Sequence, residues 1–90
     1  MTKNEVIAKI KEIIEREMEL KDEKKEILST LAPDSDLLSS LGMTSIDTLQ
    51  ILTCVEQEFD IFIEDDELTM DLIRCLNNLG DFVLVKMENA

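Results

Sequence analysis

The chain has 90 residues, enough for one small domain with a single core, and 44% of them are hydrophobic. Its 9 Lys and Arg against 21 Asp and Glu give a formal net charge of -12, which argues against nucleic acid and anionic membranes as partners and favours basic proteins. Because the chain has no histidine, Ser-His-Asp and Cys-His catalytic arrangements are excluded, and we expect no enzyme activity.

The first predicted element is an amphipathic helix from Lys3 to about Met18. Thr2 followed by Glu5 matches the capping-box pattern of a helix start. The apolar residues that recur at spacings of three and four, as a buried helix face requires, are Val6, Ile7, Ile10, Ile13 and Ile14.

A long connection is predicted after this helix. The charged segment from Glu19 to Ala32 either extends the first helix or forms a separate short helix. Pro33 and the acidic residues behind it predict a turn. The loop after the turn ends at Gly42, and the side chains that we expect to pin it onto the core are those of Leu37, Leu38 and Leu41.

A second helix is predicted from about Ser45 to Glu58. Its buried stripe consists of Ile51, Leu52, Val55 and Phe59. A second stripe, displaced around the helix, consists of Ile46, Leu49 and Thr53, flanked by Asp47, Gln50, Glu56 and Gln57. This second face mixes apolar contact with negative charge.

The remaining elements are short. We expect a packed loop at Asp60 to Ile63, a third helix from Asp65 to Asp71, and a last helix from Cys75 or Leu76 to Met87. The last helix is predicted to bury Leu76, Leu79, Phe82 and Val83. Gly80 weakens it by roughly 1 kcal/mol relative to alanine, which indicates a close helix contact.

The pattern predicts an all-α fold: a small four-helix bundle with a long first connection and a short third helix, spanning residues 1-90 as a single domain. Cys54 and Cys75 are too far apart for a CxxC pair, so we expect free thiols and no metal site. No apolar run reaches the length of a membrane span and no signal peptide is evident, so we expect a cytoplasmic protein.

The motif Leu-Gly-Met-Thr-Ser-Ile-Asp, residues 41-47, raises the question of what Ser45 does at the start of the second helix. A hydroxyl there either caps or fills the first turn, or carries a phosphate ester whose charge the free N-H groups and the helix dipole favour. The acidic run Glu64 to Glu67 has two readings as well, a solvated helix start or a docking surface for a partner.

From Leu41 to Ile63 the sequence resembles the acyl carrier protein family, which has a Leu-Gly-x-Asp-Ser-Leu-Asp motif, an acidic helix, a Glu-Glu-Phe-type ending and an isoleucine-rich loop. The resemblance extends over roughly Asp34 to Met87. It implies that Ser45 receives a 4'-phosphopantetheine arm from coenzyme A and carries acyl or aminoacyl groups as thioesters in fatty-acid, polyketide or related biosynthesis.

The resemblance also implies partners: a phosphopantetheinyl transferase, and acyl-transferring or acyl-modifying enzymes with basic docking patches, each meeting a monomeric carrier. The residues that would dock against them are Met43, Thr44, Ile46, Asp47, Leu49, Gln50, Glu56 and Ile63. Among these, the apolar contact around the arm is assigned to Met43, Ile46, Leu49 and Ile63. Carboxylates that would steer basic partners are those of Asp47, Glu56, Glu58, Glu64, Asp65 and Asp66.

Three features depart from the family pattern. Thr44 stands where the family usually has Asp, Gln50 and Gln57 stand where it is often acidic, and the charged segment Lys21 to Glu26 lengthens the first connection. Thr44 with Asp47 still makes a suitable helix cap. The lost charge weakens recognition by some transferases, and the longer connection indicates a specialised carrier.

Two other classes of function compete with a carrier. A non-enzymatic acidic regulator would bind a basic partner and leave Ser45 unmodified, and it is favoured by the same charge together with Thr44. A hydrolase using Ser45 and a lysine base is disfavoured, because no lysine lies near the motif and no oxyanion loop is evident. Modification of Ser45 distinguishes the carrier from the regulator.

Overall fold

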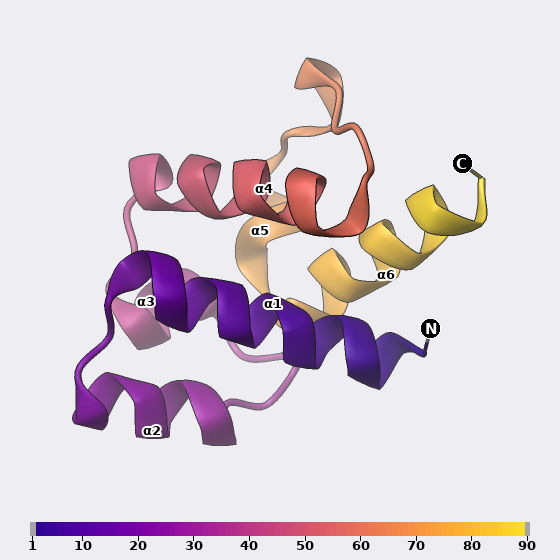
Figure 1. Ribbon diagram of the computed structural model, residues 1–90. Coiled ribbons are helices and arrows are strands. Elements are labelled where there is room, and N and C mark those ends of the chain that lie inside the picture. The colour runs from indigo at the N-terminus through magenta and orange to yellow at the C-terminus, as the bar shows by residue number, and fades with distance from the viewer. Residues whose placement is uncertain (1, 90) are drawn as a thin grey trace.

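The computed structural model describes residues 2-89, apart from the side chains of residues 70 and 71, and these residues form helices and loops without a strand. The all-α prediction is confirmed (Figure 1). In chain order the elements are α1 (Lys3–Met18), α2 (Asp22–Thr30), α3 (Leu37–Leu41), α4 (Ser45–Phe59), the 3-10 helix η1 (Asp65–Glu67), α5 (Met70–Arg74) and α6 (Leu76–Glu88).

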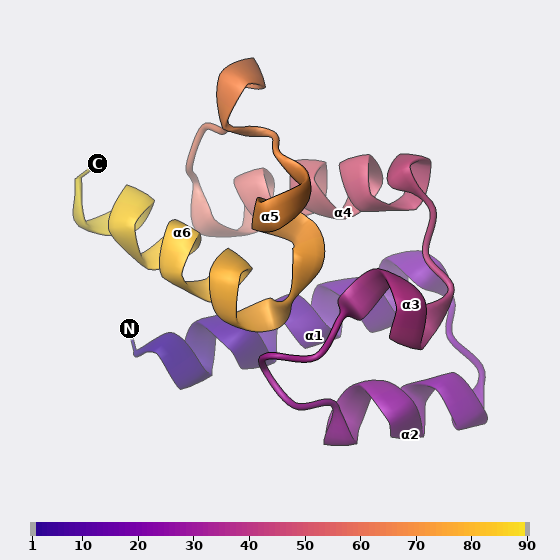
Figure 2. The same cartoon turned by 180° about the vertical axis from the view of Figure 1, so that it is seen from behind.

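Helix α1 is the central element, with α2 and α4 on opposite sides of it (Figures 1 and 2). The predicted capping box is present: Thr2 Oγ1 accepts from the N-H of Glu5 at 3.2 Å, and Glu5 Oε1 accepts from the N-H of Thr2 at 3.0 Å. The apolar face of α1 is buried as predicted, through Val6, Ile7, Ile10, Ile13 and Ile14. The core therefore forms around this helix.

The charged segment forms a separate helix, so the two alternatives for the first connection are resolved. Helix α1 ends at Met18 and is followed by the capping residue Glu19, whose backbone is left-handed with φ 50°. Helix α2 then contributes one buried side chain, Leu28, and its other residues are exposed or only partly buried. The sequence pattern could not separate these elements, because a largely exposed helix has almost no apolar period.

The predicted loop before Gly42 contains a short helix, α3, that sequence analysis did not predict. Asp36 starts it by accepting a hydrogen bond from the N-H of Ser39 at 3.1 Å. Leu37 and Leu41 are buried, as expected. Five residues are too few for a hydrophobic period to be detected, so their burial was predictable and their helical backbone was not.

Helix α4 confirms the second predicted helix and ends one residue later, at Phe59. Its predicted buried stripe is buried, through Ile51, Leu52, Val55 and Phe59. Asp60, at φ 53°, ends the helix in a left-handed conformation, and residues 61-64 form the predicted loop.

The third helix is shifted from its predicted range of Asp65 to Asp71. The structure has the 3-10 turn η1 first and restarts at α5, because Thr69 Oγ1 accepts from the N-H of Leu72 at 3.3 Å and caps a new helix. The acidic run Glu64 to Glu67 caps the start of η1: Glu67 Oε1 accepts a hydrogen bond from the N-H of Glu64 at 3.0 Å. This run is therefore in part a helix start.

Helix α6 packs directly on α1 at Gly80, which confirms the predicted close contact. A Cβ atom at Gly80 would lie 3.0 Å from Ile7 Cγ1. Phe82 differs from its predicted burial: it is only half-buried, and the Lys86 ammonium lies over its ring, 5.5 Å from the centroid. The other predicted core residues of α6, Leu76, Leu79 and Val83, are buried.

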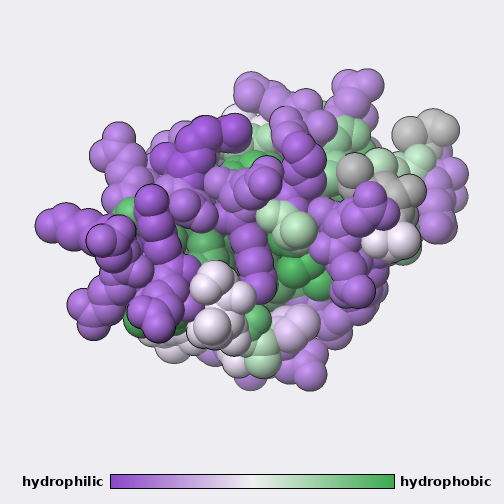
Figure 3. Space-filling view, turned by 60° about the horizontal axis from the view of Figure 1, so that its bottom comes forward, coloured by the Kyte–Doolittle hydropathy of each residue, from purple (hydrophilic) through white to green (hydrophobic). Residues whose placement is uncertain are grey.

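Much of the surface is hydrophilic. Figure 3 brings the side on which α2 lies toward the viewer, and charged and polar side chains cover most of it, with small hydrophobic patches between them. No helix among the described residues is long and apolar enough to cross a membrane.

Candidate functional site

The capping role at the start of α4 belongs to Thr44. Its Oγ1 accepts a hydrogen bond from the N-H of Asp47 at 3.2 Å, and Asp47 Oδ2 accepts one from the N-H of Thr44 at 3.1 Å. Within residues 2-89 the hydroxyl of Ser45 takes part in no hydrogen bond, and its side chain is exposed. The structure therefore separates the helix cap from the serine that follows it.

The backbone around Ser45 is held in place from both sides. Gly42, at φ 66°, ends α3 in the left-handed region that glycine adopts without strain. The N-H of Met43 then donates to the carbonyl of Leu38 at 3.0 Å, and the N-H of Thr48 donates to the carbonyl of Thr44 at 3.1 Å. The motif is a fixed turn that presents Ser45 at the first position of a 15-residue helix.

Two backbone N-H groups remain available at this helix start. The N-H of Asp47 is bound by the Thr44 side chain, whereas those of Ser45 and Ile46 bind no acceptor among the described residues. Such N-H groups and the positive end of the helix dipole favour an anion. A phosphate ester on the Ser45 oxygen fits this position.

A cavity of about 190 Å³ opens beside Ser45, between α4 and the segment that leads into α5. Its wall is mostly apolar, and none of the described residues that line it is charged. The lining residues are Ser45, Thr48, Leu49, Leu52, Leu68, Thr69 and Ile73. Sequence analysis missed Leu68, Thr69 and Ile73 as site residues, because only the folded chain brings them to α4.

The exposed apolar face predicted on α4 is present. Ile46 is 75% exposed, Leu49 is 52% exposed, and Gln50 beside them is exposed as well. Met43 and Ile63, which the resemblance assigned to contact around the arm, are 8% and 5% exposed and pack in the core. We correct that assignment, because buried side chains offer no surface to a partner.

The Glu56 carboxylate stabilises the loop after α4 through a hydrogen bond within the protein. It is half-buried, and its Oε2 accepts a hydrogen bond from the N-H of Ile63 at 2.9 Å. Of the steering carboxylates, Glu58 lies 3.3 Å from Lys9 Nζ, whereas Glu64, Asp65 and Asp66 are exposed. The negative surface of this region is therefore carried mainly by the residues after α4.

Charge is distributed unevenly along the chain. Residues 1-32 contain seven Lys and Arg against eight Asp and Glu, and residues 33-90 contain two against thirteen. One of the two later cations, Lys86, lies 2.7 Å from Glu67 Oε1. The hydrogen bond from Lys86 lowers the pKa of the Glu67 carboxyl below its ordinary value of 4.5, and the N-H of Glu64 lowers it further. The elements that surround Ser45 are thus strongly negative.

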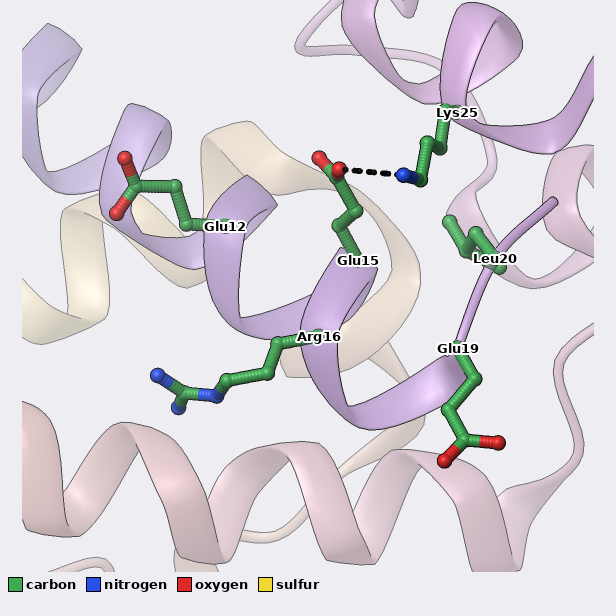
Figure 4. A pocket seen from close by; sticks show the side chains of 6 residues that line it. All are labelled: Glu12, Glu15, Arg16, Glu19, Leu20 and Lys25. Carbon is green, nitrogen blue, oxygen red and sulfur yellow. Dashed lines mark ion pairs between the residues drawn. The ribbon is translucent and has the colours of Figure 1, made fainter. Parts of the chain in front are cut away.

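A second, polar groove lies between the end of α1 and α2 (Figure 4). It has a volume of about 600 Å³, and a Glu15–Lys25 ion pair of 3.4 Å crosses it. The lining residues are Glu12, Glu15, Arg16, Glu19, Leu20 and Lys25. Both carboxylates and cations line this groove, so it has no single charge to select a ligand.

Both cysteines are free, as predicted. Cys75 is buried, and Cys54 Sγ donates a hydrogen bond to Glu17 Oε1 at 3.1 Å. Burial raises the pKa of the Cys54 thiol and the neighbouring Glu17 raises it further, so this thiol is not activated as a nucleophile. The described part of the chain contains no cluster of three or more His, Cys, Asp or Glu side chains suited to a metal ion.

Comparison with known proteins places this geometry in a family. Residues 8–83 match the family model of the phosphopantetheine attachment site. An acyl carrier protein of Karelsulcia muelleri (strain GWSS) is 40% identical over 63 residues, which cover 70% of this chain and 69% of that protein.

Two further relatives show the same similarity. The acyl carrier protein of Buchnera aphidicola subsp. Acyrthosiphon pisum (strain Tuc7) is 36% identical over 87% of this chain and 88% of its own length. A chloroplastic acyl carrier protein of Brassica napus is 34% identical over 72% of this chain and 44% of its own length.

Proposed function

Since this chain belongs to the acyl carrier protein family and bears a covalently attached 4'-phosphopantetheine, we propose that the hydroxyl oxygen of Ser45 is the attachment point. The observation that carries the proposal is the division of roles at the start of α4: Thr44 caps the helix, while the exposed Ser45 hydroxyl takes part in no hydrogen bond within the described residues. The alternative that Ser45 serves as the helix cap loses its support.

The residues around Ser45 suit the group. Attachment forms one phosphodiester bond at the Ser45 oxygen and releases the adenosine bisphosphate half of coenzyme A. The N-H groups of Ser45 and Ile46 and the dipole of α4 stabilise the negative charge of this diester. The bound arm supplies a thiol that forms thioesters. Neither cysteine of the chain is placed to take over this role, because the Cys54 thiol is hydrogen-bonded to Glu17 and Cys75 is buried.

Intact-protein mass spectrometry tests the attachment point. The unmodified parent is incubated with coenzyme A, magnesium and a phosphopantetheinyl transferase, beside Ser45→Ala and the matched control Ser39→Ala, which removes another exposed serine hydroxyl. We expect one added phosphopantetheinyl group in the parent and the control and none in Ser45→Ala. Addition to Ser45→Ala, or none to the parent with the native transferase, overturns the proposal and favours the unmodified acidic regulator.

We propose that the cargo is an acyl group whose first carbons after the thioester form an aliphatic chain. The described residues that line the cavity beside Ser45 are leucine, isoleucine, threonine and serine, and none of them carries a carboxylate that would pair with the ammonium of an aminoacyl group. Each methylene sheltered there stabilises the folded state by up to about 0.8 kcal/mol. The three relatives described above are acyl carriers by name, which supports acyl cargo, and fatty-acid synthesis is the pathway that we favour.

Thermal unfolding of loaded protein tests the cargo. We expect an octanoyl group on the arm to raise the unfolding midpoint above that of the unloaded arm, and a glycyl group to leave it unchanged. The matched variant Thr69→Asp keeps a capping side chain at the start of α5 but adds a carboxylate to the cavity wall, so it should remove most of the octanoyl effect. Equal midpoints for octanoyl and glycyl protein would contradict this cargo.

We further propose that the chain acts as a monomeric carrier that catalyses no reaction itself. Its partners are the transferase and acyl-handling enzymes with basic surfaces, which meet Ser45 flanked by Ile46, Leu49 and Gln50. The negative charge of residues 33-90 supports electrostatic steering toward such surfaces. The cytoplasmic location stays a prediction, because the relatives include bacterial and chloroplastic proteins.

A further inference from the structure

Phe62 is the most exposed aromatic residue in the structure, with an exposed fraction of 70%. It lies in the loop between α4 and η1, and its two neighbours face inward: Ile61 is half-buried and Ile63 is 5% exposed. The loop therefore has one apolar residue on each side of Phe62 that contributes to the fold, while Phe62 itself contributes its ring to the surface.

The loop that presents Phe62 is fixed by hydrogen bonds. The N-H of Ile61 donates to the carbonyl of Glu56 at 3.0 Å, and the N-H of Ile63 donates to the Glu56 carboxylate at 2.9 Å. Both neighbours of Phe62 are thus bound to the same residue of α4. The outward direction of Phe62 is built into the backbone, so little ordering entropy remains to be lost when a partner covers the ring.

The surroundings of Phe62 carry one sign of charge. From residue 26 to residue 73 the chain contains no Lys or Arg. Lys9, from α1, pairs with Glu58, and Lys86, from α6, pairs with Glu67. Within residues 2-89, the carboxylates that form no ion pair and are exposed around the loop are those of Asp60, Glu64, Asp65 and Asp66.

We propose that Phe62 with Asp60, Glu64, Asp65 and Asp66, here called the Phe62 patch, docks a basic amphipathic segment of a partner protein. The ring supplies the desolvated aromatic anchor that dominates many interfaces, and the carboxylates select Lys and Arg around it. An anionic lipid surface would meet four negative charges at the same place and be repelled. Charge complementarity therefore selects a protein partner.

The Phe62 patch lies at the opposite end of α4 from Ser45 (Figure 1). Ser45 and Phe59 are the first and last residues of the 15-residue helix, which places them roughly 21 Å apart at 1.5 Å per residue. A partner held at the patch leaves Ser45 accessible. This inference goes beyond the proposed function, because it requires no modification of Ser45.

The test uses a synthetic amphipathic helix of leucine and lysine as the probe, and a scrambled peptide of the same composition as its control. Binding to the parent, to Phe62→Ser and to Ile46→Ser is measured by calorimetry at constant salt, after circular dichroism has shown that each variant folds. Ile46 is the matched comparison, since it is 75% exposed and lies at the Ser45 end of α4. The full chain without its arm is used throughout.

We expect Phe62→Ser to weaken binding of the amphipathic peptide about tenfold, and Ile46→Ser to weaken it less. The chain contains no tryptophan, so Phe62→Trp adds a single fluorescent reporter, whose emission should shift to the blue with the amphipathic peptide and not with the scrambled one. Equal binding by the parent and Phe62→Ser, a larger loss in Ile46→Ser, or an unchanged emission would overturn the proposal.

Discussion

The contact between α1 and α6 at Gly80 predicts the sign of a single methyl substitution. Gly80→Ala gains about 1 kcal/mol of helix propensity. The added carbon, however, would lie 3.0 Å from Ile7 Cγ1, 3.5 Å from Ile7 Cδ1 and 3.7 Å from Lys3 Cγ. Overpacking of this kind costs about 1–3 kcal/mol. We therefore expect a net loss of about 1 kcal/mol in the free energy of unfolding, and a fall in the unfolding midpoint of roughly 4–8 °C.

Urea unfolding followed by far-ultraviolet circular dichroism measures this loss. Ile7→Ala removes the atoms that the new methyl group meets and should itself cost about 2–5 kcal/mol. In the double variant the methyl group occupies part of the vacated space, so the combined cost should be smaller than the sum of the single costs by about 1 kcal/mol or more. A Gly80→Ala variant as stable as the parent or more stable, or strictly additive costs, would refute the close contact.

Three further predictions concern single side chains. Thr44→Ala removes the acceptor for the N-H of Asp47 and should cost about 1 kcal/mol of unfolding free energy, whereas Thr44→Ser should cost little; equal stability of all three proteins would contradict the cap. Glu56→Ala leaves the N-H of Ile63 without its acceptor and should cost about 1–3 kcal/mol in urea unfolding, with a smaller loss in Glu56→Gln, so the reverse order would count against this hydrogen bond. Because Lys86 lowers the folded-state pKa of Glu67, the ionised carboxylate stabilises the folded state at neutral pH, and this stabilisation is lost as the pH falls through that pKa. The difference in unfolding free energy between the parent and Glu67→Gln should therefore vanish in acid. A difference that does not change with pH would contradict this prediction.

The helices that could be predicted from the sequence are those with a long apolar period. Helices α1 and α4 each present one continuous buried stripe, so their positions followed from spacing alone. Helix α3 and the restart at α5 depend on the caps Asp36 and Thr69, each of which is one polar residue among several. A helix of five residues has no apolar period that would distinguish the capping residue from other polar residues of the sequence.

The candidate site was predictable where it is local and not where it is assembled. The helix cap formed by Thr44 and Asp47 lies within one motif and was predicted from it, whereas the role of Ser45 in the same motif stays a prediction. The cavity beside Ser45 needs Leu68 and Ile73, which meet α4 only in the folded chain. Met43 and Ile63 were expected at the surface and are buried in the structure, since the sequence of a motif does not show whether an apolar residue packs in the core or lies at the surface.

The uneven charge distribution has a consequence for how the molecule approaches other proteins. Helices α1 and α2 belong to a segment whose charges nearly cancel, whereas α4 lies across α1 from α2 within a segment of thirteen carboxylates and two cations (Figure 1). The molecule therefore has a permanent dipole moment in addition to its net charge. In the field of a basic surface this dipole experiences a torque that turns the side of α4 toward that surface. The torque acts while the two proteins are still separated by about a Debye length, roughly 8–10 Å of solution. Its encounters are thus biased in orientation, and a larger share of collisions begin with the side of the molecule on which α4 lies facing the partner.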